Sequence, residues 1–369
     1  MAPSAIATAA ETEVPIHAKG QAKTLINEPL KLSGSLNEYE SFDVTPAIGT
    51  EFPKANLADW LNAPNADDLI RDLAITISQR GVVFFRAQDG LTNELQKKLI
   101  LKLGELSGRP STSSLHIHPL LNSEREHGGD DLEVSTISSK QYDKFYRKTN
   151  DDGVVVTKRS DRDELWHADI SFEPTPADYT SLRLTELPSS GGDTLWASGY
   201  DVYDRLSPAY QKFLESLTAT FFQPHFGQIA EKQGFELYDK PRGAPDNIGK
   251  VLKAVHPVVR TNPVTGWKSV FPIGAHVGHI NDVTAEESKN LLSWFYDLVA
   301  HDHSIQVRLK WQNPNDLAIW DNRSVFHSAT FDYDGLGDRF GNRVVGIGEH
   351  PYLDPNSVGK ADYLRSTSN

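Results

Sequence analysis

The feature that most constrains the fold of this chain is a series of short alternating segments in its second half. Apolar and polar side chains alternate within each segment, and turn residues separate one segment from the next. The segments cover residues 179–187, 193–198, 253–260, 268–273, 305–311, 316–320, 325–331 and 342–348. Many short strands joined by turns are typical of a β-sandwich or barrel of the jelly-roll type. We therefore expect a mainly β fold with flanking helices (α+β).

Helical periodicity interrupts these segments and also precedes them. The stretch "NADDLIRDLAITISQRG" places apolar side chains on one helical face and ends with Gly81 at the position that favours a left-handed backbone. A buried strand follows at 82–86, and three further helices are expected at about 92–106, 207–217 and 284–302. The last of these opens with Thr284 and Glu287, the spacing of a capping box.

Composition narrows the class of protein. The chain has 369 residues, of which 38% are hydrophobic, enough to bury a large core. Its formal net charge of −13 opposes binding to nucleic acid or to an acidic membrane, so an anionic partner needs a local positive pocket. The chain has no cysteine, so His, Asp and Glu are the candidate metal ligands. A homo-oligomer is left open.

The chain is expected to divide into a tail and one domain. Residues 1–36 show no sustained period and are predicted to form a flexible tail, followed by a single catalytic domain over 37–369. Within the domain we expect a lid at about 110–164 and a helical insert at about 201–300. The first residues lack the basic region of a targeting peptide, and no apolar run is long enough to span a membrane, so a cytoplasmic location is expected.

A histidine and an aspartate two residues apart, His167 and Asp169, form the first candidate site. With 13 histidines and 50 acidic residues, about two such triplets are expected by chance, so the spacing alone is weak. Residues two apart in an extended segment share a face, and His327, just after a tight turn between two strands, is the best third ligand. Two imidazoles and one carboxylate form the facial triad that leaves coordination positions open on non-haem Fe(II).

Two arginines follow on the next strand. Arg339 and Arg343 share a face by the period of two, with no acidic residue on that face of the strand. Buried cations without acidic partners are costly unless anions come from outside. The pattern suits a dicarboxylate cosubstrate at one arginine and an anionic substrate at the other, and Thr194 could add a hydroxyl donor.

Longer blocks of the chain resemble the taurine dioxygenase family of Fe(II)/2-oxoglutarate-dependent alkylsulfonate and alkylsulfate dioxygenases. The blocks are "LHIHPL" (115–120), "WHADISFEPTPADYTSLRLTELPSSGGDTLWAS" (166–198), "HPVVRTNPVTGWKSVF" (256–271) and "LAIWDNRSVFHSATFDY" (317–333), followed by Arg339 and Arg343. The resemblance implies a double-stranded β-helix, that is, a cupin-like jelly roll. It also implies Fe(II) as cofactor, with 2-oxoglutarate and O₂ as cosubstrates.

The resemblance assigns residues to three roles by matching motif positions. The implied roles are iron ligation by His167, Asp169 and His327, 2-oxoglutarate binding by Thr194 and Arg339, and binding of an anionic head group by His118 and Arg343. Taurine-type members carry a tyrosine and an asparagine near the substrate amine, where this chain has Leu121 and Asp163. These two, with Ile170 and Phe172 beside the metal pair, complete the expected substrate contacts. The changed amine end leaves room for a more apolar sulfonate or sulfate ester than taurine, while Asp163 could itself accept an ammonium group.

Structural explanations remain open for several of these residues. His116 and His118 form a second alternating pair that could bind a metal, and His118 could be a packed strand histidine. Arg339 could pair with Asp338 or Asp332, and Phe172 could belong to the core. His256 lies in a family block but has no chemical role from the sequence.

The expected activity is hydroxylation of the carbon next to the sulfur group of an alkylsulfonate or alkyl sulfate ester. The products would be an aldehyde and sulfite or sulfate, with succinate and CO₂. Two alternatives stay open: a 2-oxoglutarate-dependent hydroxylase of a carboxylate-bearing metabolite, and a non-catalytic binding protein on the same fold.

Overall fold

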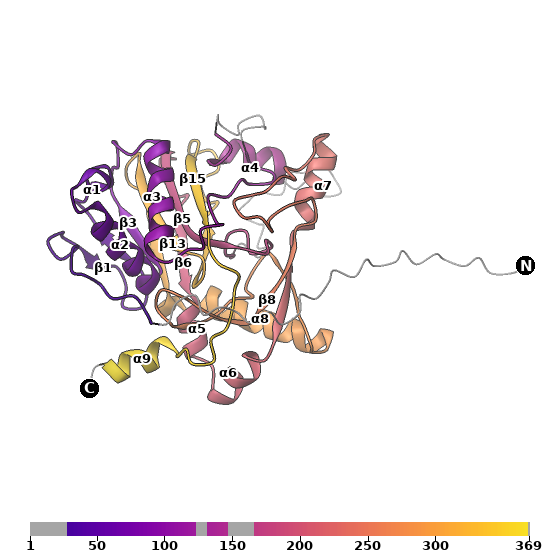
Figure 1. The fold of residues 1–369 in the computed structure, drawn as a ribbon. Helices are drawn as coiled ribbons and strands as arrows, with labels where there is room; N and C mark the ends of the chain where they lie inside the picture. Colours follow the sequence, from indigo (N-terminus) through magenta and orange to yellow (C-terminus); the bar gives the residue numbers. More distant parts are fainter. Residues whose placement is uncertain (1–27, 123–130, 147–165, 368–369) are drawn as a thin grey trace, which may run out of the picture.

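The alternating segments pair into two main β-sheets in the structure, a computed structural model that describes residues 28–122, 131–146 and 166–367 (Figure 1). The larger sheet has the order β1-β2-β3-β13-β5-β15-β4 and is antiparallel except between β2 and β3. Its strands are β1 (Phe42–Asp43), β2 (Thr50–Phe52), β3 (Val82–Phe85), β13 (Asp316–Asp321), β5 (Ala177–Glu186), β15 (Phe340–Ile347) and β4 (Ser135–Ser138). The smaller sheet consists of β12 (Gln306–Leu309), β6 (Thr194–Ser198) and β14 (Val325–Ala329).

Apolar side chains from both sheets meet in one core. Trp196 of β6 and Trp320 of β13 lie with their ring centroids 5.7 Å apart, and Phe84 of β3 packs on Trp196. Leu182 of β5 and Val307 of β12 belong to the same buried cluster. This face-to-face packing of antiparallel sheets is the jelly roll that the alternating pattern predicts.

Helices cover the outer face of the larger sheet (Figure 1). They are α1 (Leu57–Asn62), α2 (Ala66–Arg80) and α3 (Asn93–Leu106). The apolar face of α2 is buried as its periodicity predicts, and the helix ends at Gly81, which has a φ of 77°. A Cβ at Gly81 would lie 2.7 Å from a methyl group of Val325, so glycine is required there by space as well as by backbone conformation.

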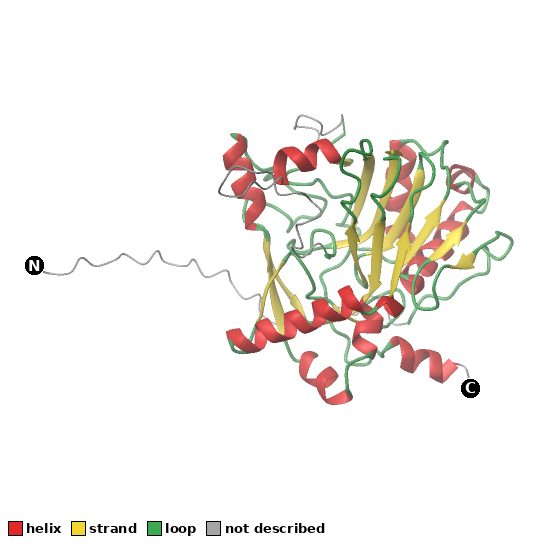
Figure 2. Cartoon of the chain, turned by 180° about the vertical axis from the view of Figure 1, so that it is seen from behind, coloured by secondary structure: helices red, strands yellow, loops and turns green. Residues whose placement is uncertain are grey.

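The segment 201–300 is mixed rather than purely helical. Its helices are α5 (Gly199–Asp204), α6 (Pro208–Leu214), α7 (Pro224–Gln233) and α8 (Ala285–His301), the last with the expected capping box. Its strands form two small sheets, β9 (Val259–Thr261) with β10 (Lys268–Val270), and β7 (Thr218–Phe222) between β8 (Lys253–Pro257) and β11 (Val277–Ile280). Figure 2 shows the sheet of β7, β8 and β11 beside the jelly roll. A short η1 (His303–Ile305) follows α8, and α9 (Lys360–Thr367) ends the described chain.

The described part of the expected lid attaches to the jelly roll. Residues 110–122 include an isolated bridge from Leu115 to Gly346, and β4 pairs with β15 at the edge of the larger sheet. The helix α4 (Ser139–Tyr146) follows β4. The rest of the expected lid lies outside the described residues, so a lid remains a prediction.

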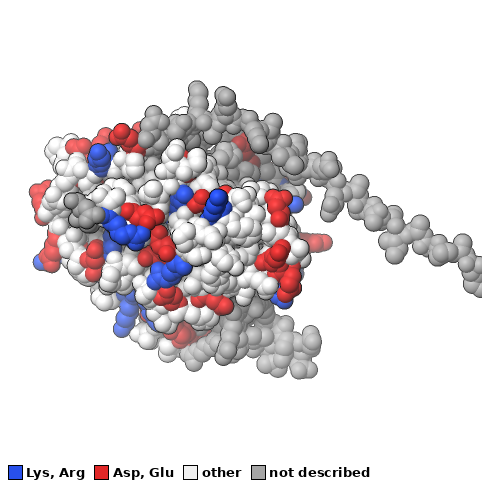
Figure 3. Space-filling view, turned by 90° about the horizontal axis from the view of Figure 1, so that it is seen from below, with Lys and Arg blue, Asp and Glu red and all other residues white. Residues whose placement is uncertain are grey.

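The surface carries mixed charge. On the face drawn in Figure 3, lysine and arginine side chains lie among aspartate and glutamate side chains. A search of the described residues found no helix with the length and apolar character that crossing a membrane requires.

Residues 28–36, predicted as part of a flexible tail, are instead bound to α2. The carboxylate of Asp72 accepts hydrogen bonds from the backbone N–H groups of Ser33, Gly34 and Ser35 at 2.8 to 3.0 Å. Leu36 is buried in the core beneath α1 and α2. The sequence misses this contact because a carboxylate that accepts several backbone N–H groups leaves no periodic signal.

Replacement of Asp72 by alanine should release residues 33–35 from α2. Burial alone would raise the pKa of Asp72, but the hydrogen bonds that residues 33–35 donate to its carboxylate outweigh burial and hold the pKa below its usual value. The stabilisation is therefore present at neutral pH and is lost as the pH falls below about 4. We expect Asp72→Ala to cost about 2 kcal/mol in the free energy of unfolding.

Hydrogen exchange of the amides of residues 33–35 measures this effect. Exchange should be faster in Asp72→Ala than in the wild type at pH 7, and should not change in Asp68→Ala, which removes an exposed acid one turn earlier on α2. Equal protection in wild type and Asp72→Ala would contradict the contact.

Candidate metal centre and substrate site

A backbone contact between two distant segments brings the predicted histidines together. The N–H of His167 donates to the carbonyl of His327 at 3.1 Å, and the N–H of His327 donates to the carbonyl of His167 at 2.9 Å. His327 lies in β14, and its ring centroid is 4.2 Å from that of His167. Two reciprocal hydrogen bonds thus fix both imidazoles at one point of the jelly roll.

The turn that leads to His327 also holds Asp169. The N–H of Asp169 donates to the side-chain oxygen of Asn322 at 3.0 Å, and Asn322 lies between β13 and β14. Asn322 is fixed in turn by donating to the hydroxyl of Thr180 at 2.8 Å. Asn322 has no role that its residue type predicts, and its position in the "WDNR" turn is the signal that the sequence offers.

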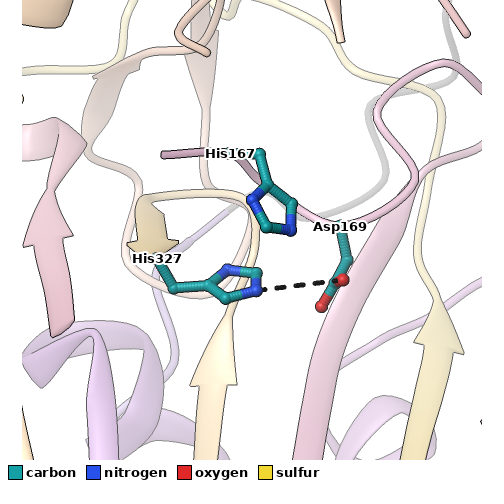
Figure 4. A group of neighbouring side chains, drawn as sticks. All are labelled: His167, Asp169 and His327. Carbon is teal, nitrogen blue, oxygen red and sulfur yellow. Dashed lines mark ion pairs between the residues drawn. The ribbon is translucent and has the colours of Figure 1, made fainter. Parts of the chain in front are cut away.

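The three residues fit a metal ion. One ligand atom from each of His167, Asp169 and His327 lies within 4.8 Å of the other two (Figure 4). The Nε2 atom of His327 is 4.0 Å from Oδ1 of Asp169, and Oδ2 is buried without a hydrogen-bond partner in the described chain. Two imidazole nitrogens and one carboxylate oxygen, on one side of an open position, suit Fe(II).

The protonation states also suit a metal. Burial lowers the pKa of His327 to about 3, so its imidazole is neutral and has a lone pair to donate. Burial alone would raise the pKa of Asp169, but the charge of Arg343, with smaller contributions from His327 and His167, holds that pKa far below its usual value. The site therefore presents a carboxylate and neutral imidazole at neutral pH.

Arg343 corrects one expectation. The sequence placed no acidic residue on the face of the strand that carries Arg343, but its Nη1 atom donates to Oδ1 of Asp169 at 2.6 Å. The acid comes from a different segment, which the period of a single strand does not reveal. The Nε atom of Arg343 is buried and has no protein acceptor among the described residues, so the guanidinium retains a donor for a further anion.

Arg339 lacks an ionic partner among the described residues. Its side chain is buried, 4% exposed, and donates to the carbonyl of Gly192 at 2.9 Å and to the hydroxyl oxygen of Thr194 at 3.3 Å. The alternative that Arg339 pairs with Asp338 or Asp332 is wrong, since Asp338 pairs with Lys140 at 2.9 Å and the Arg339 guanidinium bonds only neutral groups. A carboxylate from outside the protein could pair with this buried guanidinium and offset the cost of its burial.

Trp311 prepares Thr194 to donate. The indole Nε1 of Trp311 donates to the Thr194 hydroxyl oxygen at 3.2 Å, in addition to the bond from Arg339. Because that oxygen accepts two hydrogen bonds, its own proton is available to an outside acceptor. Thr194 pairs with Ala329 between β6 and β14, so the hydroxyl lies on the same face as His327.

The second histidine pair does not form a metal site. His118 accepts the N–H groups of Leu120 and Leu121 at its Nδ1 atom, at 3.1 and 2.9 Å, so its proton resides on Nε2. His116 contacts Glu173 at 3.2 Å. The two rings are 6.1 Å apart, and the metal-competent group found among the described residues is the triad above. Burial lowers the pKa of His118 well below its usual value, leaving a neutral N–H donor.

Three of the remaining expected substrate contacts are buried together and form an apolar wall. Leu121, Ile170 and Phe172 are all buried in one cluster with Phe226 of α7. Asp163, which the sequence placed at the amine end of the substrate, lies outside the described residues.

Two histidines without a role from the sequence lie next to the triad segment. His256 contacts the carbonyls of Ser171 and Glu173 at 3.0 and 3.1 Å, and thereby holds the loop that follows the metal ligands. His276 lies with its ring centroid 5.5 Å from that of His167. His256 lies in a family block, whereas His276 lies in none of the blocks, so only the three-dimensional structure identifies His276.

Removal of one ligand should abolish tight metal binding. We expect His327→Ala to weaken Fe(II) binding by at least about a hundredfold, since even residues behind metal ligands contribute ten- to a hundredfold. Anaerobic titration with Fe(II) measures this affinity. His301→Ala, which removes an exposed histidine at the end of α8, is the control and should bind as the wild type does. Unchanged affinity in His327→Ala would exclude this site.

Comparison with known proteins places these features in a wider group. The family description "Taurine catabolism dioxygenase TauD, TfdA family" matches residues 40–345. The chain is 52% identical over 345 residues to the α-ketoglutarate-dependent dioxygenase btcD of Neocamarosporium betae, covering 92% of this chain and 99% of that protein. It is 31% identical over 324 residues to an α-ketoglutarate-dependent sulfonate dioxygenase of Saccharomyces cerevisiae, covering 88% and 70% of the two chains.

A solved structure has the same architecture. The crystal structure of a putative α-ketoglutarate-dependent taurine dioxygenase from Burkholderia xenovorans superimposes with a TM-score of 0.62 at 25% identity. The match covers 86% of this chain and 92% of that one. The prediction of a jelly roll is thereby confirmed.

Proposed function

The chain belongs to the TauD, TfdA family of α-ketoglutarate-dependent dioxygenases, and on that premise we propose that it oxidises an alkylsulfonate or alkyl sulfate ester. Membership makes it an oxidoreductase that uses Fe(II), 2-oxoglutarate (α-ketoglutarate) and O₂. In our proposal His167, Asp169 and His327 hold the iron, which supplies open coordination positions for the oxidative chemistry.

We assign the distal carboxylate of 2-oxoglutarate to Arg339 and Thr194. The support is the buried guanidinium of Arg339, whose hydrogen bonds within the described residues go only to neutral groups, together with the donor proton that Trp311 leaves on Thr194. A carboxylate there would satisfy the buried positive charge and accept from both side chains. Thr194 and His327 share a face of the smaller sheet, which sets this subsite beside the triad.

Arg339→Gln should therefore act mainly on the cosubstrate. Loss of a charge-assisted hydrogen bond costs about 1.5–3 kcal/mol, so KM for 2-oxoglutarate should rise by about 10- to 150-fold. Steady-state kinetics with varied 2-oxoglutarate measure the change, and anaerobic Fe(II) affinity should stay within about twofold. Lys140→Gln, which alters an exposed cation nearby, is the control. An unchanged KM for 2-oxoglutarate would refute the assignment.

One observation carries the substrate proposal. Arg343 contacts the ligand carboxylate of Asp169 and keeps a buried Nε donor without a protein acceptor in the described chain. The backbone amides of residues 120 and 121 fix the proton of His118 on Nε2, which gives a second donor. A tetrahedral or planar anionic head group would accept from both. The sulfonate dioxygenase among the relatives favours a sulfur oxyanion.

The protein residues then position the substrate and exclude water. With its head group at Arg343, the adjoining carbon would lie next to the triad, since Arg343 and the metal ligand Asp169 are in contact. The apolar wall of Leu121, Ile170 and Phe172 would keep water from the reacting carbon. The overall reaction would convert substrate, 2-oxoglutarate and O₂ into aldehyde, sulfite or sulfate, succinate and CO₂.

A carboxylate-bearing substrate is the second candidate. A guanidinium recognises negative charge rather than sulfur, so Arg343 would also bind a carboxylate. The printed name of the relative from Neocamarosporium betae specifies no substrate.

A substrate panel tests the proposal. Succinate release is measured from Fe(II), 2-oxoglutarate and air with alkylsulfonates, alkyl sulfates, aryloxyacetates and alkanoates of matched chain length. We expect stimulation of at least about tenfold by one of the sulfur anions, with sulfite or sulfate formed in equal amount to succinate. The stimulation should be lost in Arg343→Gln even at Fe(II) and 2-oxoglutarate concentrations that saturate both sites. Stimulation by carboxylates alone would overturn the sulfur assignment.

A further inference from the structure

His276 belongs to a row of rings that joins His118 to His167. Successive ring centroids along His118, Phe226, Phe172, His276 and His167 are 5.1, 5.7, 5.1 and 5.5 Å apart. The row starts at the histidine proposed to bind the head group and ends at a triad histidine. His276 is thus a polar residue in contact with Phe172 of the apolar wall, beside the proposed position of the substrate's carbon chain.

A glycine allows His276 to come this close. The carbonyl of Trp166 would lie 1.7 Å from a Cβ at residue 274, where Gly274 has a φ of 93°. The absence of a side chain lets the N–H of Ala275 donate to that carbonyl at 3.2 Å. The chain before β11 is therefore pressed against the segment that carries His167, and the imidazole of His276 meets that of His167 nearly edge to face.

Gln223 determines which nitrogen of His276 carries the proton. The side-chain oxygen of Gln223 accepts the N–H of His225 at 3.2 Å, so its amide nitrogen is the atom 2.9 Å from Nδ1 of His276. An amide nitrogen donates, so Nδ1 accepts and the proton of a neutral ring resides on Nε2.

The Nε2–H group has no acceptor among the described residues. Within the described residues, the His276 ring takes part in one hydrogen bond, which Gln223 donates to Nδ1. The rings of Phe172 and His167 contact the His276 ring edge to face. A donor fixed by a dedicated partner at the wall of an active site selects ligands that offer an acceptor, because a ligand without one leaves the donor unsatisfied.

We propose that His276 determines substrate specificity by donating from Nε2 to an oxygen of the substrate carbon chain. Resting on the proposed function, this narrows the substrate to an anion that carries a second, neutral oxygen acceptor such as a carbonyl. A simple alkyl chain would bind beside His276 less tightly, because it offers no acceptor to Nε2–H.

Isosteric probe pairs test the proposal. Butane-1-sulfonate is compared with 3-oxobutane-1-sulfonate, and hexanoate with 5-oxohexanoate, so that each pair differs by one carbonyl. Binding to the anaerobic enzyme loaded with Fe(II) and 2-oxoglutarate is followed by the perturbation of its visible charge-transfer absorption, which requires no turnover. We expect the wild type to prefer an oxo compound over its partner by about two- to tenfold, the contribution of one neutral hydrogen bond.

Three variants test whether His276 causes the preference for the oxo compounds. His276→Phe keeps an aromatic ring without the donor and should bring the ratio to about one, chiefly by weakening the oxo compound. His276→Gln, which can place an amide donor near the position of Nε2, should restore part of the preference. His279→Phe makes the same exchange at an exposed histidine of β11 and should keep the wild-type ratio.

The outcomes separate this inference from the proposed function. Equal binding within both pairs by the wild type, or an unchanged ratio in His276→Phe, would overturn it. A preference confined to the carboxylate pair, with no sulfur anion stimulating succinate release, would refute the sulfur assignment and still support the role of His276.

Discussion

The two hydrogen bonds exchanged by the backbones of His167 and His327 are the contact on which the site depends. They join a segment that belongs to no main strand to β14 of the smaller sheet. Asn322 adds a third bond from the turn before β14 to Asp169, so all three ligands share one backbone support. The triad is rigid because each ligand is fixed through its main chain, before any metal contributes.

The two buried arginines differ in how their charge is balanced. Arg343 contacts Asp169, a carboxylate whose charge a bound cation would share, whereas Arg339 bonds only neutral groups in the part of the chain that the structure describes. Removing either guanidinium from water is expensive, and proteins retain such groups where an anion completes the balance. The two positions therefore provide an electrostatic reason for a site that takes up two different anions.

Much of the jelly roll could be predicted from the sequence, since its strands have a strict period of two and clear turns. β5, β6, β12, β13, β14 and β15 lie within about two residues of their expected bounds. β1, β2, β4, β7 and β11 were missed, because strands of two to five residues carry little alternation. The expected strand at 253–260 is divided into β8 and β9.

The metal ligands could be predicted because their chemistry restricts the residue types. The pairing of Arg343 with Asp169 could not, since periodicity describes one strand and says nothing of a segment that crosses it. His276 and Gln223 were missed for a similar reason. Their roles arise from a close approach at Gly274 and from one side-chain hydrogen bond, and neither leaves a pattern in the local sequence.

The strands and the connecting segments of the site differ in how readily they accept changes of sequence. Thr194 and His327 belong to hydrogen-bonded strands, where an inserted residue would turn every following side chain to the other face. Leu121, Phe172 and His276 lie in connecting segments, which tolerate changes of length and composition. Changes in the connecting segments can therefore alter the apolar part of the site while the sheet keeps Thr194 and His327 in place.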